Sequence, residues 1–173
     1  TRRLSSAASD VYKRQGEHKE TIQTGTMSAA LGGIVGIFEM PNTNPLTTTP
    51  EALEHKIKRG TETAYTDFAY YFGGTFENSK NLPLWEKLDG VCGIKIFMGA
   101  STGNLLSATD EEVEAVVANG NRVIAVHAED EFLMNENKKT ILKDSNDVGM
   151  HCKWRDVHSC LLYTSPSPRD KSS

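Results

Sequence analysis

Several features that define common protein classes are missing from this sequence. Its three cysteines include no Cys-x-x-Cys pair, which excludes a disulfide framework and a cysteine-based metal motif. No apolar run is long enough to span a membrane, and no signal peptide is visible. Basic clusters are also absent and the net charge is −4, which argues against nucleic acid or an anionic membrane as a partner. We therefore expect a cytoplasmic protein that binds neither nucleic acid nor membrane.

Both ends of the chain lack the patterns of folded protein. Residues 5–15 and 160–170 show no apolar periodicity, capping pattern or turn pattern, so we treat residues 1–15 and 159–173 as the two flanks. Within them, residues 9–15 and 160–165 can be encoded by opposite strands of one DNA segment, and they resemble translated adapter ends of transposon-based sequencing libraries. We expect both flanks to be adapter-derived and residues 16–158 to be the native part. The flanks hold six of the 19 basic and two of the 23 acidic residues, so 13 basic and 21 acidic residues remain, a net charge of −8.

Between the flanks, helical and strand-like stretches alternate. We predict helices over residues 21–31, 49–59, 82–88 and 109–118, and strands over residues 34–40, 66–72, 93–98 and 122–126. Thr49 and Thr109 are expected N-caps, and Gly60 is expected to end the second helix. Residues 131–158 are polar and weakly patterned, and we expect loop and helix there.

This alternation predicts an α/β protein with a parallel sheet and right-handed crossovers. The strands are apolar without clean alternation, which predicts burial on both faces. In such sheets, functional residues gather at the carboxyl ends of the strands, whether the sheet is open or closed as a barrel. Asn42 and His127 fall just after predicted strands, and Lys95 lies slightly deeper within its own strand.

Lys95 stands in the run Gly-Ile-Lys-Ile-Phe-Met-Gly, where a charged amine is out of place. A buried lysine must find a partner, lose its proton or be chemically modified. Carboxylation by CO₂ would turn it into a carbamate, an oxygen donor able to bridge two cations. The alternative is an edge strand in which Lys95 faces water.

The neighbouring polar residues allow more than one role. His127 can be a base, a metal ligand or a hydrogen-bonded core residue. Asn42, in Met-Pro-Asn-Thr-Asn-Pro, offers an amide donor and acceptor, and its alternative is a turn residue. Residues 129–131 form an acidic turn that is either solvated or supports His127. The loop 99–103 could donate backbone N–H groups to an anion, but it lacks the lysine of a P-loop, which favours a simple strand-to-helix turn.

Four motifs follow one another along the native part. They are His18-Lys19-Glu20 with Thr24-Gly25 and Gly32-Gly33, then Met40-Pro41-Asn42-Thr43, then the run from Gly93 to Gly103, and finally His127-Ala128-Glu129-Asp130. In this order the motifs resemble dihydroorotase and, more broadly, the cyclic-amide hydrolases of the amidohydrolase superfamily. The resemblance covers essentially all of residues 16–158.

The resemblance implies a TIM (β/α)8 barrel, of which residues 16–158 would form about strands 2–5. It also implies a site with two zinc ions and reversible hydrolysis of dihydroorotate to N-carbamoyl-aspartate in pyrimidine biosynthesis. By position, Lys95 resembles the carboxylated lysine that bridges the metals, and His127 resembles a zinc ligand. Asn42 resembles the asparagine that holds the substrate carboxylate. The metals would activate water and polarise the ring carbonyl.

The chain also departs from the family pattern. The His-x-His metal pair and a substrate-binding arginine would lie before Gly16, and a further histidine ligand and the catalytic aspartate would lie beyond His158. No catalytic residue is therefore assigned. We expect a fragment that is inactive, poor in metal and prone to aggregation, because a half barrel leaves sheet edges open. We expect the parent to be a homo-oligomer that acts on a small cyclic amide.

Other readings compete with dihydroorotase. The Met-Pro-Asn-Thr element favours dihydroorotase or allantoinase over hydantoinase, and allantoinase is the closest enzymatic alternative. A non-catalytic scaffold paralogue of the same fold would have no need for Lys95 and His127. A phosphate- or nucleotide-binding domain that uses loop 99–103 leaves Lys95 and Asn42 unexplained.

Overall fold

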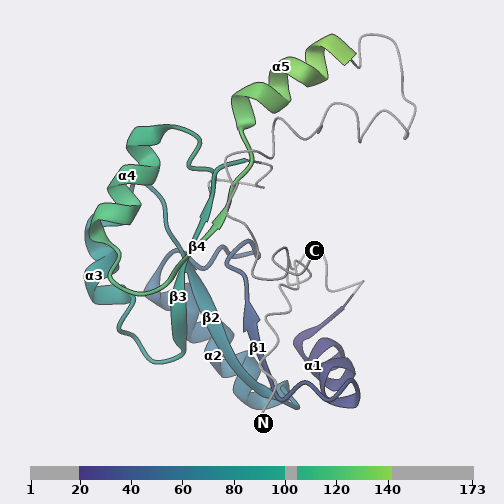
Figure 1. Ribbon diagram of the computed structural model, residues 1–173. Helices are drawn as coiled ribbons and strands as arrows, with labels where there is room; N and C mark the ends of the chain where they lie inside the picture. Colours follow the sequence, from purple (N-terminus) through teal and green to yellow (C-terminus); the bar gives the residue numbers. More distant parts are fainter. Residues whose placement is uncertain (1–19, 100–104, 142–173) are drawn as a thin grey trace, which may run out of the picture.

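The structure is a computed structural model that describes residues 20–99 and 105–141 (Figure 1). Its strands are β1 (Gly36–Glu39), β2 (Asp67–Gly73), β3 (Val91–Phe97) and β4 (Ile124–His127). Its helices are α1 (Ile22–Leu31), α2 (Pro50–Thr63), the 3₁₀ helix η2 (Ser79–Asn81), α3 (Leu82–Trp85), α4 (Asp110–Asn119) and α5 (Glu131–Ile141). The two flanks and most of loop 99–103 lie outside the described residues.

The strands form one parallel sheet in the order β1-β2-β3-β4. Each strand pairs with the one before it in sequence, so the order never reverses as it does at the switch point of a doubly wound sheet. The sheet is curled, as a sector of a barrel is (Figure 1). The predicted α/β class and partial barrel are confirmed.

Capping residues begin the helices where the sequence predicts them. The Thr49 side chain accepts a backbone hydrogen bond at the start of α2, with Pro50 in the first turn. Thr109 and Glu112 form a capping box at the start of α4. Both caps satisfy N–H groups that have no partner inside their own helix.

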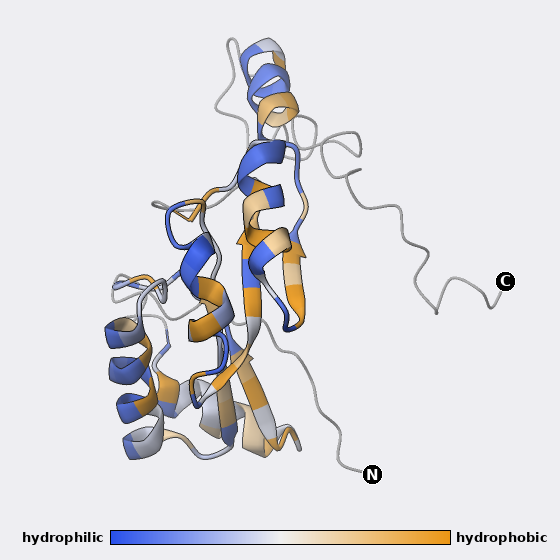
Figure 2. Ribbon diagram, turned by 90° about the vertical axis from the view of Figure 1, so that its left-hand side faces the viewer, coloured by the Kyte–Doolittle hydropathy of each residue, from blue (hydrophilic) through white to orange (hydrophobic). Residues whose placement is uncertain are grey.

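The hydrophobic core lies between the sheet and the helices. Its buried members are Leu53 of α2, Tyr70 and Phe72 of β2, Leu82 of α3, Val91, Ile94 and Ile96 of β3, and Val116 of α4. Figure 2 shows the helices with hydrophilic residues on the sides turned away from the strands. Because Ile94 and Ile96 face the helices, Lys95 between them faces the opposite side of the sheet.

The prediction that Gly60 ends the second helix is wrong, because α2 continues to Thr63. A Cβ atom at Gly60 would lie 2.5 Å from the Tyr70 hydroxyl and 2.7 Å from ring carbons of Phe68. The glycine therefore lets two aromatic side chains of β2 approach the helix closely. Contact across the fold, and not helix termination, explains this glycine.

The fourth strand starts later than predicted, at Ile124 and not at 122. The backbone N–H of Arg122 binds the Glu86 carboxylate at 3.0 Å, and its guanidinium donates to the Val91 carbonyl. Arg122 is thus hydrogen-bonded to Glu86, next to α3, and to Val91 of β3, and the paired residues of β4 begin only at Ile124. The last residue of β4 is His127.

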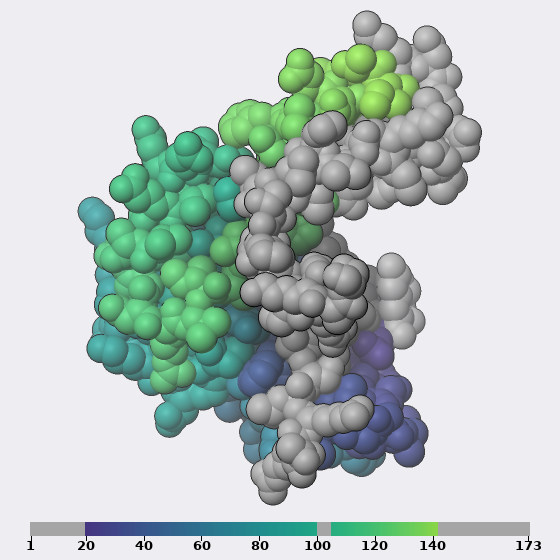
Figure 3. Space-filling model, viewed as in Figure 1, coloured from purple at the N-terminus to yellow at the C-terminus, as the bar shows by residue number. Residues whose placement is uncertain are grey.

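The helix α5 stands away from the body that contains the sheet (Figure 3). Its N-terminus is capped by Asp130, whose carboxylate accepts the Leu133 N–H at 2.9 Å. Met134 is its buried residue, and its methyl carbon would lie 2.9 Å from a Cβ at Gly99. No helix within residues 20–99 and 105–141 has both the length and the apolar character needed to cross a membrane.

Candidate functional site

Lys95 is buried in the third strand, with 8% of its surface exposed. Its strand lies between β2 and β4, pairing with Gly73 on one side and Ala125 on the other. The Nζ atom lies 4.9 Å from the centre of the Phe97 ring, which stands on the same face two residues along. The alternative of an exposed edge-strand lysine is therefore wrong.

His127 lies on the same face of the sheet as Lys95. It pairs with Phe97 in the β3–β4 register, and the centres of these two rings are 5.9 Å apart. Since Lys95 pairs with Ala125, His127 is two residues further along the neighbouring strand. The structure thus brings the two predicted metal ligands together at the carboxyl end of the sheet, with Phe97 beside both.

Glu129 binds the His127 ring. Its Oε2 lies 2.8 Å from Nε2 of His127, and the two side chains are 14% and 40% exposed. A carboxylate partner favours a proton on Nε2, which leaves the lone pair of Nδ1 available to a metal. The sequence predicts that the acidic turn at residues 129–131 is either solvated or supports His127. Glu129 supports His127, whereas Asp130 and Glu131 belong to the start of α5.

Asn42 lies in the loop that follows β1, at the same end of the sheet. It is half-buried and comes three residues after Glu39, the last residue of the strand. Asn42 follows β1 and Lys95 lies in β3, and these strands are not neighbours, since β2 lies between them. The structure therefore places Asn42 at the same rim as Lys95 and His127 but does not put it beside them.

The donor set for a metal is incomplete in the part of the chain that the structure describes. That part contains no group of three or more His, Cys, Asp or Glu residues able to hold an ion. Lys95 as a carbamate and His127 through Nδ1 are suitable donors in kind for zinc. They are too few for a closed site, so further ligands would have to come from elsewhere.

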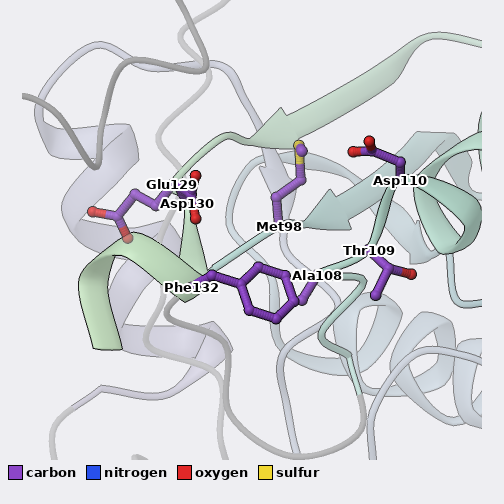
Figure 4. A pocket seen from close by; sticks show the side chains of 7 residues that line it. All are labelled: Met98, Ala108, Thr109, Asp110, Glu129, Asp130 and Phe132. Atoms are coloured by element: carbon purple, nitrogen blue, oxygen red, sulfur yellow. The ribbon is translucent and has the colours of Figure 1, made fainter. Parts of the chain in front are cut away.

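A pocket of about 300 Å³ adjoins the site beyond the ends of β3 and β4 (Figure 4). It is lined by Met98, Ala108, Thr109, Asp110, Glu129, Asp130 and Phe132. Glu129 and Asp130 stand on one side of it and Asp110 on the other. Lys95 and His127 do not line this pocket, which opens between the starts of α4 and α5.

A second buried lysine, Lys56 of α2, was not anticipated from the sequence. Its Nζ lies 3.1 Å from Oε1 of Glu39 at the end of β1. Burial raises the pKa of Glu39 and lowers that of Lys56, and the attraction between the two charges opposes both shifts. A signal was present, because Lys56 falls on the apolar face of its helix with Leu53 and Gly60.

Known proteins resemble this chain in sequence and in structure. The dihydroorotase of Thermococcus kodakarensis is 34% identical over 130 residues, which cover 70% of this chain and 28% of the relative. The L-hydantoinase of Paenarthrobacter aurescens is 38% identical over 120 residues, which cover 66% of this chain and 26% of the relative. The solved structure of the L-hydantoinase from Arthrobacter aurescens superposes with a TM-score of 0.72 at 32% identity, covering 80% of this chain and 32% of that chain. This chain thus spans less than a third of each relative.

The match to a family profile extends over most of the chain. The dihydro-orotase-like family matches residues 7–140, which include all four strands and the three predicted site residues. The sequence identity to the dihydroorotase and the superposition on the L-hydantoinase structure agree with this match. The chain therefore belongs to the dihydro-orotase-like family.

Proposed function

We propose that this chain is a segment of a zinc-dependent dihydroorotase, which hydrolyses dihydroorotate reversibly to N-carbamoyl-aspartate in pyrimidine biosynthesis. The observation that carries the proposal is the common face shared by Lys95 and His127 at the carboxyl end of the sheet. A core with only a structural role has no need for a lysine at 8% exposure beside a carboxylate-bound histidine.

Lys95 is proposed to act as a carbamate. Its Nζ ammonium first gives up one proton. The neutral amine then adds to the carbon of CO₂, forming a nitrogen–carbon bond while one C=O double bond becomes a single bond, and releases a second proton, so that a cation becomes an anion. The product presents two oxygens where the free amine has one nitrogen. Burial of Lys95 favours the neutral amine that reacts, because a buried ammonium is costly, and bound metal ions would balance the charge of the carbamate.

His127 and Asn42 have separate proposed roles. Glu129 holds Nε2 of His127, so that the ring keeps one orientation and offers Nδ1 as a zinc donor. Asn42 is proposed to donate its amide N–H to the substrate carboxylate at the rim of the sheet. Zinc, when bound, would supply a Lewis acid and an activated water for attack on the ring amide.

The role of Lys95 can be tested in the longer protein encoded by the uninterrupted reading frame. We expect Lys95→Ala to lower zinc content and to reduce dihydroorotate turnover by more than about 100-fold, since the site loses a metal ligand. Lys87→Ala, which changes an exposed lysine, is the matched control. Labelling with ¹³CO₂ should give a carbamate NMR signal that Lys95→Ala lacks. Full activity of that variant would disprove the assignment.

A second substrate class is favoured by the comparisons themselves. An L-hydantoinase is as similar to this chain in sequence as the dihydroorotases are, and a solved L-hydantoinase structure superposes on the chain. Hydantoin and allantoin are five-membered cyclic ureas, whereas dihydroorotate has a six-membered ring with a carboxylate. Turnover rates of the longer protein, measured on each of the three compounds, distinguish a dihydroorotase from a hydantoinase and an allantoinase. Inactivity on all three points to a non-catalytic scaffold paralogue.

A further inference from the structure

A buried ion pair joins the end of β1 to α2. Nζ of Lys56 lies 3.1 Å from Oε1 of Glu39, and the same ammonium donates a hydrogen bond to the Met40 carbonyl at 3.1 Å. The two side chains are 9% and 2% exposed. Nζ also lies 5.5 Å from the centre of the Tyr70 ring. Lys56 therefore contacts the main chain where β1 ends and the loop carrying Asn42 begins.

That loop, residues 40–47, is anchored at both ends. At its start, Lys56 holds the Met40 carbonyl. At its end, the Thr47 carbonyl accepts a hydrogen bond from the Gly73 N–H of β2 at 2.8 Å. The first anchor comes from a helix and the second from the neighbouring strand, so the loop is fixed to two separate elements.

Internal hydrogen bonds make the loop a closed unit. The Pro41 carbonyl accepts from the N–H groups of both Thr43, at 2.8 Å, and Thr47, at 3.0 Å. Asn42 lies between Pro41 and Thr43, inside this unit. A shift of the first anchor would therefore move the backbone of Asn42 directly.

Stability alone does not account for a charged pair at this position. Apolar side chains of similar volume often stabilise a core as well as a buried ion pair does, because the desolvation of two charges is costly. Such replacements would fill the space of Glu39 and Lys56 but would leave the Met40 carbonyl without its donor. The contribution specific to Lys56 is the hydrogen bond to the loop.

We propose that Lys56, with Glu39 as its counter-ion, is a positioning residue that sets the place of Asn42 for the substrate carboxylate. This inference deepens the proposed function and rests on it. Lys56 lies on the helix side of the sheet and acts only through the loop.

The test removes both charges together, because Lys56→Met alone would leave the Glu39 carboxylate buried without a partner. The double variant Glu39→Leu with Lys56→Met keeps the volume and the apolar packing. Lys58→Met, an exposed lysine of the same helix, is the matched control. Asn42→Ala, alone and combined with the double variant, shows whether the pair acts through Asn42.

Hydrogen exchange in this chain, followed by NMR, provides a measurement independent of activity. In the double variant we expect the amide protons of Thr47 and Gly73 to exchange about tenfold faster, because their loop has lost one charged anchor. The core amide of Ile94, bonded to the Val123 carbonyl, should stay as slow as in the unsubstituted chain. Equal rates at Thr47 and Gly73 in the double variant and in Lys58→Met would overturn the proposal.

Kinetics of the longer protein then test the link to the substrate. We expect the double variant to raise KM for dihydroorotate about tenfold and to change kcat less than about twofold, the pattern of weakened substrate binding. In the Asn42→Ala background, removal of the pair should add no further increase. Additive effects would contradict a role through Asn42. Inactivity of the unsubstituted longer protein counts against the proposed function, and the exchange experiment then decides the role of Lys56 alone.

Discussion

At the scale of single residues, Glu86 is a buried carboxylate that accepts hydrogen bonds from backbone N–H groups. The residue is 1% exposed, and its Oε2 accepts hydrogen bonds from the N–H groups of Asn121 at 2.9 Å and Arg122 at 3.0 Å. Burial on its own would raise the pKa of Glu86, but the hydrogen bonds outweigh it and hold the pKa below the usual 4.5. Glu86 thereby fastens the end of α3 to the segment that leads into β4.

This pKa shift predicts how stability depends on pH. A carboxylate whose pKa is lower in the folded state stabilises the fold above its unfolded pKa, and that contribution is lost as the pH falls through the folded pKa. We expect Glu86→Gln to lower the free energy of unfolding at pH 7 by about 1.5–3 kcal/mol, the worth of hydrogen bonds to a charged group. The loss should shrink as the pH falls below 4.5. Urea unfolding at several pH values measures it.

The control for this prediction is Glu111→Gln, which changes an exposed glutamate in the first turn of α4. It should alter the unfolding free energy by less than about 0.5 kcal/mol at every pH. Equal losses of unfolding free energy in both variants would show that the buried hydrogen bonds of Glu86 do not stabilise the fold.

The two buried lysines differ in how visible they are in the sequence. Lys95 interrupts an apolar strand, where every neighbour predicts burial, so its position alone marks it. Lys56 lies in a helix rich in charged residues, and only its place on the same helix face as Leu53 and Gly60 indicates burial. Its partner, Glu39, is 17 residues away along the chain, and only the packing of α2 on β1 brings the charges together. Long-range pairing of this kind is not encoded by local pattern.

At the scale of elements, helix propensity and side-chain packing predict opposite effects on stability when Gly60 is replaced. Propensity alone predicts that Gly60→Ala stabilises α2 by about 1 kcal/mol. The added Cβ would, however, lie 2.5 Å from the Tyr70 hydroxyl, which is fixed by its hydrogen bond to the Lys56 carbonyl. We expect a net loss of about 1–3 kcal/mol from overpacking. Chemical unfolding followed by circular dichroism measures it, with exposed Glu62→Ala in the same helix as the control.

A stabilised Gly60→Ala variant would mean that Tyr70 and Phe68 can move aside at little cost. The helix caps differ from Gly60 in the range of their contacts. Thr49 and Thr109 act on residues within one turn, so their roles can be predicted locally. The role of Gly60 depends on a strand that follows it in the chain, and local rules therefore gave the wrong helix end.

At the scale of the whole molecule, the sheet has two outer strands among the described residues. Within that part of the chain, β1 pairs only with β2, and β4 pairs only with β3. Val126 in β4 is 44% exposed. An outer strand with exposed apolar side chains is a template for pairing with other chains. This supports the expectation that the isolated chain aggregates.

The aggregation can be tested with two matched substitutions. We expect Val126→Lys to slow aggregation of the chain at least about twofold, because a lysine on an outer strand disfavours further pairing. Val117→Lys adds the same charge at a similarly exposed site, 50% exposed, on helix α4. Light scattering over time distinguishes them. If both variants slow aggregation equally, net charge and not the strand edge governs it.

Family membership and substrate are determined by different parts of the molecule. Dihydroorotases and an L-hydantoinase share a similar sequence identity with this chain, and a solved L-hydantoinase structure superposes on its fold. The ring that is hydrolysed depends on side chains around the substrate, and this chain spans less than a third of each relative. The preference of Met-Pro-Asn-Thr for dihydroorotate or allantoin over hydantoin therefore stays a prediction.

The sequence by itself determined the alternation of helices and strands, the caps, the family and the places of Asn42, Lys95 and His127 in or after predicted strands. These depend on local periodicity or on motifs read in order. Only the tertiary structure decided that Lys95 and His127 share one face, because strand register is set by pairing between segments far apart in the chain. The same holds for the pair of Glu39 and Lys56, whose attraction exists only once α2 packs against β1.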